Sequence, residues 1–368
     1  MNPRRRRWLQ QLAGATAAGL VPATGHPADA ASVQRGRVLS FPRDHGAHLE
    51  ARTEWWYATG WLAERAGAEP SHGFQVTFFR SRTGLAQGNP SRFAARHLLF
   101  AHAALTTLKD SRHQHDQRLA RWSGAPGAVL GEADTTDGHV RLGDWRLRRD
   151  AAGWQAQVPA RDFNLRLDLR PTQSLLLQGD AGYSQKGPDP RQASHYYSEP
   201  QLDVRAMLPD AAAGSARGQG WLDHEWSDEL LHPQAVGWDW VGMNLEDGSA
   251  LTVFRLRRKD GSTLWDGGSF RSPRGGGTYV FSPGEATFSA QRKWTSPLSR
   301  ATYPVEWMIR TPADFYMVRA VIDNQELDSR ASTGAIYWEG LAELIDSNGK
   351  KAGRGYLEMT GYAQPLRL

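Results

Sequence analysis

The stretch Leu165-Arg166-Leu167-Asp168-Leu169 alternates apolar and charged residues without interruption. Side chains along a β-strand point alternately to the two faces of its sheet, so this pattern predicts a strand with one buried and one solvated face. The same period of two recurs in short segments along the chain, separated by turn signals such as Thr136-Asp137-Gly138 and Glu246-Asp247-Gly248. No segment shows the pattern of a long amphipathic helix. We therefore predict an all-β protein of antiparallel strands, arranged as a sandwich or as closed barrels.

The chain length allows two domains of this kind. A short segment from residue 230 to residue 236 separates two tryptophan-rich motifs, and we place the boundary there, which gives domains of residues 31–231 and 232–368. Each domain could close a barrel whose interior holds side chains or one small ligand. Residues 182–200 are expected to form an irregular loop, because they contain Lys186-Gly187-Pro188-Asp189-Pro190.

The first thirty residues predict an export signal and not a part of the fold. Arg5-Arg6-Arg7-Trp8-Leu9 fits the twin-arginine pattern, and a moderately apolar run rich in Ala and Gly follows from residue 12 to residue 21. Ala28-Asp29-Ala30 places small residues at positions −3 and −1 of a cleavage after Ala30. The apolar run is shorter than the ~20 residues that a membrane-spanning helix needs. We therefore expect a periplasmic or secreted protein that does not span the membrane.

Charge and composition exclude several classes of protein. The chain has 44 Lys and Arg against 39 Asp and Glu; without the four Arg and one Asp of the signal, 40 against 38 leaves a net charge of +2. Because no dense basic patch remains, nucleic acid is not an expected partner. The absence of cysteine excludes disulfide bonds and a lipid-anchored cysteine. Fifteen tryptophans favour a fold with large aromatic-lined interiors.

The tryptophans gather around acidic residues in two motifs. Gly220-Trp221-Leu222-Asp223-His224-Glu225-Trp226-Ser227 is followed closely by Gly237-Trp238-Asp239-Trp240. Such a cluster predicts an apolar wall with a few titratable groups set into it, which suits a pocket for a large, mostly apolar ligand. The alternative is a well-packed barrel end, whose acids accept hydrogen bonds from indole and backbone N–H groups.

Several motifs together resemble the AttH/carotenoid 1,2-hydratase-like family of exported bacterial proteins. In chain order they are His48-Leu49-Glu50, Glu54-Trp55-Trp56-Tyr57, residues 73–80, Phe100-Ala101-His102-Ala103, Tyr196-Tyr197-Ser198, residues 221–227, residues 237–240, residues 303–307, residues 337–340 and residues 353–362. The resemblance implies two lipocalin-like β-barrels packed side by side. Members are variously described as secreted hydrolases, as lipocalin-like proteins or as relatives of enzymes that add water across a terminal carotenoid double bond. The exported branch often lies beside genes for an ABC transporter, which implies a possible transporter partner.

Hydration of an isolated alkene requires a proton for one carbon, stabilisation of the carbocation and a water molecule on the far side. Asp223 or His224 could donate the proton, because burial raises the pKa of a carboxyl group, and Asp239 could position the water. On a strand, Asp223 and Glu225 point to one face. His224 and Trp226 point to the other. The sequence leaves open which pair faces the ligand.

Aromatic side chains of these motifs are expected to line the ligand pocket, because indole and phenol faces stabilise a cation. They are Trp56, Tyr57, Tyr196, Tyr197, Trp221, Trp226, Trp238 and Trp240. For Glu54 the alternative is a structural role, with its carboxylate bonded to a neighbouring indole or to Arg80. Glu339 and Glu358 are expected to satisfy loop backbone at the end of a barrel.

Other chemistries lack their usual sequence signals. Asp223-His224-Glu225 is too tight on one strand to give three ligands to one metal ion, so we predict no metal site. The chain has no Gly-x-Ser-x-Gly nucleophile elbow and no phosphate-binding loop, and we predict no cofactor. Three functions remain open. The first is a cofactor-free acid–base hydratase or isomerase (a hydro-lyase) that acts on a lipid or isoprenoid. The second is a non-catalytic periplasmic lipid carrier that works with an ABC transporter, and the third is a scaffold with filled barrels.

Overall fold

A computed structural model describes residues 32–65, 67–208, 215–229, 231–273 and 276–366. The predicted export signal at residues 1–30 lies outside the described residues. Within them, the regular secondary structure is β-sheet except for a single 3-10 turn, η2 (Arg43–His45). No described helix has the length and apolar character needed to cross a bilayer. The all-β prediction is confirmed.

Sheet A holds the strands of the first part of the chain, and its neighbouring strands are antiparallel. The strands are β1 (Thr53–Ala63), β2 (His72–Arg82), β3 (His97–Thr107), β4 (Arg112–Trp122), β5 (Gly131–Ala133), β6 (His139–Leu142), β7 (Trp145–Asp150), β8 (Gly153–Pro159), β9 (Asn164–Arg170), β10 (Leu176–Leu177), β11 (Tyr183–Gln185), β12 (Ala193–Met207) and β13 (Ala216–Ser227). The order is β4-β3-β2-β1-β13-β12-β9-β8-β7-β6-β5, and β10 and β11 pair with β12. Because β4 also contacts β5 and β6, the sheet curls into a nearly closed barrel.

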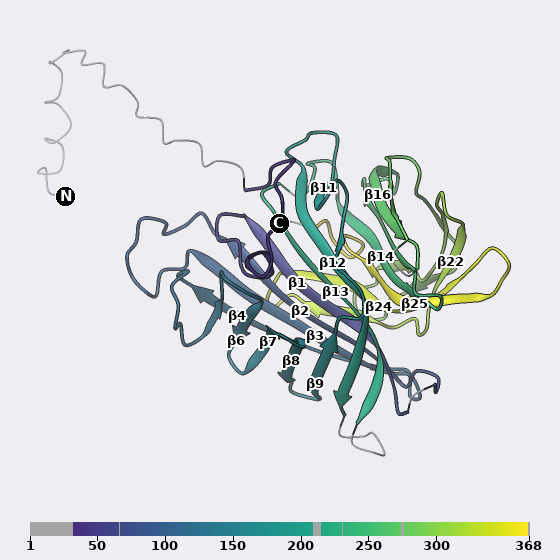
Figure 1. The fold of residues 1–368 in the computed structure, drawn as a ribbon, viewed down its shortest axis with the longest axis horizontal. Helices are drawn as coiled ribbons and strands as arrows, with labels where there is room; N and C mark the ends of the chain where they lie inside the picture. The colour runs from purple at the N-terminus through teal and green to yellow at the C-terminus, as the bar shows by residue number, and fades with distance from the viewer. Residues whose placement is uncertain (1–31, 66, 209–214, 230, 274–275, 367–368) are drawn as a thin grey trace, which may run out of the picture. The chain divides into compact units, whose positions relative to one another are not determined.

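Sheet B holds most strands of the second part of the chain. They are β14 (Gly237–Leu245), β15 (Ala250–Arg257), β16 (Thr263–Arg271), β17 (Thr278–Phe281), β18 (Thr287–Ala290), β21 (Glu306–Arg310), β22 (Phe315–Ala320), β23 (Glu326–Ser329), β24 (Ala335–Ile345) and β25 (Lys351–Met359). Their order is β17-β16-β15-β14-β25-β24-β22-β21-β18, with β23 on β24, and β19 (Lys293–Thr295) pairs with β20 (Thr302–Pro304) as a separate ribbon. Figure 1 shows sheet A in purple to teal and sheet B in green to yellow.

The two sheets share one plan. In sheet A the first long strand, β1, pairs with the last strand, β13; in sheet B, β14 pairs with β25 in the same way. The sheets touch along these strands, since β1 contacts β25, β13 contacts β14, and β2 contacts β24. The fold is therefore two lipocalin-like antiparallel β-barrels side by side, as predicted. The predicted boundary near residue 231 falls in the connection between β13 and β14, and the division into separate domains stays a prediction.

The barrel interiors are filled with side chains. In β9, Leu165, Leu167 and Leu169 are buried and the residues between them are exposed, as the alternation predicts. Trp145 and Trp154 are fully buried in the core of sheet A, which leaves little space for a ligand inside that barrel.

Residues 182–200 are not one irregular loop, and that prediction is wrong. β11 and the fifteen-residue strand β12 occupy most of this range, and only the Gly-Pro-Asp-Pro turn between them is irregular. Tyr196 and Tyr197 therefore lie within a strand and not at a barrel mouth. β12 is buried on both faces over its first ten residues, so it lacks the alternation that identified the other strands.

Candidate functional site between the two barrels

A cavity of about 380 Å³ lies between the outer faces of the two sheets. Its walls come mainly from β1, β2, β3, β12 and β13 of sheet A and from β14, β15, β24 and β25 of sheet B. The aromatic residues that line it are Trp55, Tyr57, Phe79, Phe100, Tyr196, Trp238, Trp240, Phe254 and Tyr337. Titratable side chains that line it include Lys186, Asp223, Glu225, Glu339 and Glu358. The site is thus an apolar, aromatic space with acids on both walls.

Strand register decides which face of β13 meets this cavity. Asp223 pairs with Tyr57 of β1 on one side and with Ser198 of β12 on the other. Because directly paired residues share a face of the sheet, these side chains point the same way. Asp223 and Glu225 line the cavity, whereas His224 and Trp226 point into barrel A.

The Asp223 carboxyl is buried, with 3% of its surface exposed, and accepts hydrogen bonds at both oxygens. The Tyr196 hydroxyl donates to Oδ2 over 2.7 Å. The Ser198 hydroxyl and the Trp221 indole N–H each donate to Oδ1 over 2.6 Å. Burial raises the pKa of Asp223 to about 7, although these hydrogen bonds act in the opposite direction. A carboxylic acid with this pKa can hold and release a proton near neutral pH.

Glu225, on the same face, forms an ion pair with Lys186. The Lys186 Nζ lies 3.1 Å from the Glu225 Oε1, which also accepts a hydrogen bond from the Ser194 hydroxyl. The same ammonium group lies over the rings of Tyr196 and Phe254, 4.8 Å and 4.1 Å from their centroids. Because Phe254 belongs to sheet B, this ion pair joins the two walls of the cavity.

The wall from sheet B carries two more carboxyls. Glu339 of β24 pairs directly with Glu358 of β25, so both side chains point into the cavity from adjacent strands. Burial raises the pKa of Glu358 to about 7, and the nearby charges of Asp223 and Glu225 add to the rise. Burial and the charge of Glu358 raise the pKa of Glu339 as well. Two such carboxyls are most stable when they hold at least one proton between them.

Glu339 and Glu358 lie within strands, and the structural role expected for them stays a prediction. Both line the cavity, because the barrels pack through these faces. The Tyr57 hydroxyl and the Glu339 carboxyl interact with each other, although the Tyr57 hydroxyl and the Glu339 Oε1 have no partner in good hydrogen-bond geometry among the described residues. A water molecule or a ligand that bridges the two groups would complete their hydrogen bonds.

Aromatic contacts connect the two walls. The Trp240 indole N–H of sheet B donates to the Tyr196 hydroxyl of sheet A over 3.2 Å. Tyr57 meets the Trp240 ring edge to face, with centroids 5.5 Å apart, and Trp221 lies 6.3 Å from the same ring. Of the aromatic residues predicted to bind the ligand, the structure brings Tyr57, Tyr196, Trp238 and Trp240 to the cavity surface, with Trp221 behind Asp223.

The remaining predicted residues lie on the opposite faces, inside the barrels. Trp56, Tyr197, His224 and Trp226 are fully buried together in barrel A, where the Trp56 and His224 rings stack with centroids 4.7 Å apart. Burial lowers the pKa of His224, which favours its neutral form and makes it a poor proton donor.

Asp239 lies inside barrel B. It accepts hydrogen bonds from the Arg255 Nε over 2.7 Å and from the Tyr362 hydroxyl over 2.9 Å. The Arg257 Nε lies 3.5 Å from the same carboxylate. Asp239 is fully buried and does not line the cavity, so the water-positioning role expected for it has no geometric support here.

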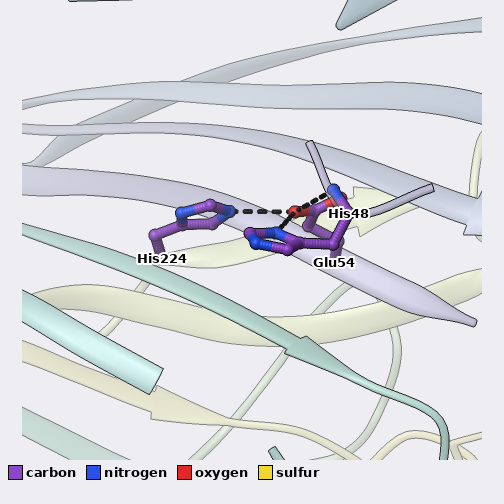
Figure 2. A group of neighbouring side chains, drawn as sticks. All are labelled: His48, Glu54 and His224. Atoms are coloured by element: carbon purple, nitrogen blue, oxygen red, sulfur yellow. Dashed lines mark hydrogen bonds and ion pairs between the residues drawn. The ribbon is translucent and has the colours of Figure 1, made fainter. Parts of the chain in front are cut away.

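A second group of buried titratable residues lies in barrel A. Figure 2 shows the His48 and His224 imidazoles directed at the same carboxylate of Glu54. The His48 Nδ1 and His224 Nε2 lie 2.8 Å and 3.0 Å from the Glu54 Oε1, and the three ligand atoms lie within 4.8 Å of one another. The His48 Nε2 is 2.9 Å from the Asp44 Oδ1, and a carboxylate in this position is common behind metal-bound histidines.

The charges around this group favour an ion-pair network over a metal site. The Arg80 Nε donates to the Glu54 Oε2 over 2.8 Å, which confirms the structural alternative considered for Glu54. A divalent ion at Glu54 would stand beside this guanidinium. Both ring nitrogens of His48 already lie within hydrogen-bond distance of carboxylate oxygens. Although burial opposes it, Arg80 and the histidine hydrogen bonds hold the pKa of Glu54 well below its ordinary value.

Sequence reasoning missed Lys186, Glu225, Glu339 and Glu358 as residues of the site. The signal for three of them was present, because Glu225, Glu339 and Glu358 each lie within two residues of an aromatic residue in a resembling motif. Lys186 carried no comparable signal, since it precedes a Gly-Pro turn and is directed to the cavity only by the fold.

Comparisons with known proteins agree with this architecture. The family model described as AttH-like matches residues 32–362. The crystal structure of an AttH protein from Nitrosomonas europaea has 43% sequence identity, covers 90% of this chain and 98% of its own, and superposes with a TM-score of 0.81. Kievitone hydratase from Nectria haematococca has 13% identity, covers 89% of this chain and 94% of its own, and has a TM-score of 0.63, which shows a shared fold. A comparison with curated proteins finds no match. The chain belongs to the AttH-like family.

Proposed function

We propose that this protein is a cofactor-free hydratase that adds water to a carbon–carbon double bond of a large apolar substrate, a lipid or an isoprenoid. The observation that carries the proposal is Asp223, a buried carboxyl with a pKa raised to about 7 at the wall of an aromatic cavity. The volume of about 380 Å³ suits a substrate of this kind. Kievitone hydratase has the same fold, and its name states a hydration reaction.

In the proposed reaction the protonated Asp223 gives its proton to one alkene carbon. The hydrogen bonds from Tyr196, Ser198 and Trp221 stabilise the carboxylate that remains. The alkene electron pair forms the new C–H bond and leaves a carbocation at the other carbon. The faces of Trp238 and Trp240 stabilise this cation in the dry cavity.

Water completes the addition from the wall of sheet B. The Tyr57 hydroxyl and the Glu339 carboxyl face each other at the cavity and are placed to hold the attacking water molecule between them. Its oxygen forms the C–O bond, and its proton passes to the Glu339–Glu358 pair. Proton exchange with solvent then returns this pair and Asp223 to their starting states, so the net reaction is alkene plus water to alcohol.

The test begins with the ligand. Native mass spectrometry of residues 31–368, purified gently from the periplasm, should reveal a bound lipid or isoprenoid. Incubation of this compound in H₂¹⁸O should then yield an alcohol that carries the heavy oxygen. Asp223→Asn should lower the rate by about 10²–10⁴-fold. The matched control is Asp168→Asn, an identical change at an exposed position of β9. An unaltered rate in Asp223→Asn would reject the assignment.

The alternative is a periplasmic lipid carrier that delivers its ligand to an ABC transporter. The observation in its favour is the apolar character of the cavity, which suits storage as well as catalysis. A carrier should bind the same compound, leave it unchanged in H₂¹⁸O and keep its affinity in Asp223→Asn. The carrier function requires export, which we propose follows the twin-arginine route. Arg5→Lys with Arg6→Lys should block this export, and a processed periplasmic protein in the double variant would contradict the route.

A further inference from the structure

Two neighbouring loops at one end of barrel A expose large apolar side chains. Leu85 and Phe93, in the β2–β3 loop, are 70% and 77% exposed. Val129 and Leu130, in the β4–β5 loop, are 86% and 56% exposed. Large apolar side chains at this exposure are costly in water when they gather in one place, and such patches commonly mark an interaction surface.

The two loops contact each other. The Arg96 guanidinium donates hydrogen bonds to the Asn89 carbonyl in its own loop and to the Ser123 carbonyl in the other. A Cβ at Gly127 would lie 3.8 Å from the Arg92 guanidinium, so that side chain also reaches across. The loops therefore lie against each other, and we call their four exposed apolar residues the loop patch (Leu85, Phe93, Val129 and Leu130).

The charge of this surface has a single sign. Residues 82–96 and 121–131 contain four arginines (Arg82, Arg92, Arg96 and Arg121) and no acidic residue. The next acid, Glu132, lies 3.6 Å from the Arg141 guanidinium and also accepts a hydrogen bond from the Gly127 backbone N–H. Exposed apolar side chains beside an exposed arginine such as Arg92 match the interface of a bilayer with anionic lipids, where apolar groups insert and arginines meet phosphate.

The β2–β3 loop begins and ends close to the cavity wall. Ser81 and Leu98 pair directly at the ends of β2 and β3, and both line the cavity. The β2–β3 loop extends from this pair, so Leu85 and Phe93 lie on the segment that leaves the cavity wall. An apolar ligand dissolved in a membrane would meet the cavity beside this loop.

We propose that the loop patch docks the protein on the surface of anionic phospholipid bilayers, where the cavity exchanges its apolar ligand. The exchange rests on the proposed function, because it requires an apolar ligand, whereas the docking does not. Vesicle binding is measured without substrate. If the docking proposal fails, vesicle binding is lost and hydration remains. If the proposed function fails, hydration is absent and vesicle binding remains.

The experiment uses residues 31–368 and two kinds of vesicle, one of phosphatidylcholine and one of equal parts phosphatidylcholine and phosphatidylglycerol. Sedimentation should show binding to the anionic vesicles that weakens as salt is raised. Leu85→Ser with Phe93→Ser should lower the partition coefficient by about tenfold or more, and Arg92→Glu by several-fold. Matched controls are Phe315→Ser, a half-exposed residue of β22, and Arg166→Glu, an exposed residue of β9; neither should alter binding.

A label at the loop gives a second readout. The chain has no cysteine, so Phe93→Cys offers one unique site for an environment-sensitive fluorophore. Its emission should shift to the blue with anionic vesicles, and the same label at Phe315→Cys should not respond. Equal binding to both vesicle types, binding unaffected by the loop variants, or an unshifted emission from the label at position 93 would each overturn the proposal.

Discussion

The Tyr196 hydroxyl donates a 2.7 Å hydrogen bond to the Asp223 carboxyl, and both residues lie on the outer face of barrel A. The same hydroxyl accepts a hydrogen bond from Trp240 of barrel B. The acid that we assign as proton donor is therefore held by a residue that also connects the barrels. This relationship makes the chemistry of Asp223 depend on the packing of the two sheets.

The pH dependence of hydration should report Asp223. Because the donor must be protonated, the rate should fall as the pH rises through about 7, the raised pKa of this carboxyl in its buried site. Ser198→Ala removes one hydrogen bond that favours the carboxylate, so the alkaline limb should move upward by about half to one pH unit. Rates of both proteins between pH 5 and 9 give the measurement. If the pH at which the rate falls is the same in both proteins, the group that titrates is not Asp223.

Stability should fall with rising pH on account of the same carboxyl. The unfolded chain loses this proton near the ordinary value of 3.8, whereas the folded protein keeps it to about 7. Between these values the folded state binds more protons than the unfolded state, so each pH unit of increase destabilises it. The total is on the order of 4 kcal/mol. Buried histidines with lowered pKa values, such as His45 and His224, act in the opposite direction, so the comparison is between proteins. From pH 5 to pH 8, denaturant unfolding should show a more favourable change in stability in Asp223→Asn than in the parent; equal changes would contradict the assignment.

Glu339 and Tyr57 should affect water addition more than ligand binding. Glu339→Gln keeps the size of the side chain but removes a group that can take a proton, and we expect the hydration rate to fall by about 10²-fold or more. Tyr57→Phe removes only a hydroxyl that holds the water, and a fall of about tenfold is expected. The ligand Kd should change little in both. A large rise in Kd with an unchanged rate would assign these residues to binding.

Asp239 should prove structural. Asp239→Asn removes the charge that faces Arg255 inside barrel B, and an uncompensated buried charge costs about 3–5 kcal/mol. Denaturant unfolding should show this loss, while the protein that remains folded should keep its hydration rate per molecule. A lower hydration rate with unchanged stability would instead support a catalytic role for Asp239.

The Glu54 network should behave as an ion pair and not as a metal site. Glu54→Gln leaves Arg80 without its carboxylate partner and should destabilise the protein by about 3–5 kcal/mol. Dialysis against a chelator should leave the Tm of the parent unchanged, and added zinc should not raise it. A zinc-dependent rise in Tm that His48→Gln abolishes would establish the metal alternative.

Much of the fold was predictable from the sequence. Strict alternation in residues 165–169 predicted a half-buried strand, and the structure buries the three leucines on one face. The tryptophan motifs predicted an apolar wall with titratable groups around Asp223; aromatic side chains line the cavity beside it, and the Trp221 indole N–H also donates to its carboxyl. β12 was not predicted, because both of its faces are buried over its first ten residues. Its sequence therefore lacks the alternation of apolar and polar residues by which a strand is recognised.

The face that carries the site was decided only in three dimensions. By itself, the sequence determined that Asp223 and Glu225 share one side of a strand and His224 the other, because that follows from the local geometry of a β-strand. Tertiary structure decided that the first side is the site, because barrel B packs against it and brings Glu339 from a distant segment. The same packing buries Asp223 and raises its pKa, and no local pattern encodes a desolvation that depends on two sheets meeting.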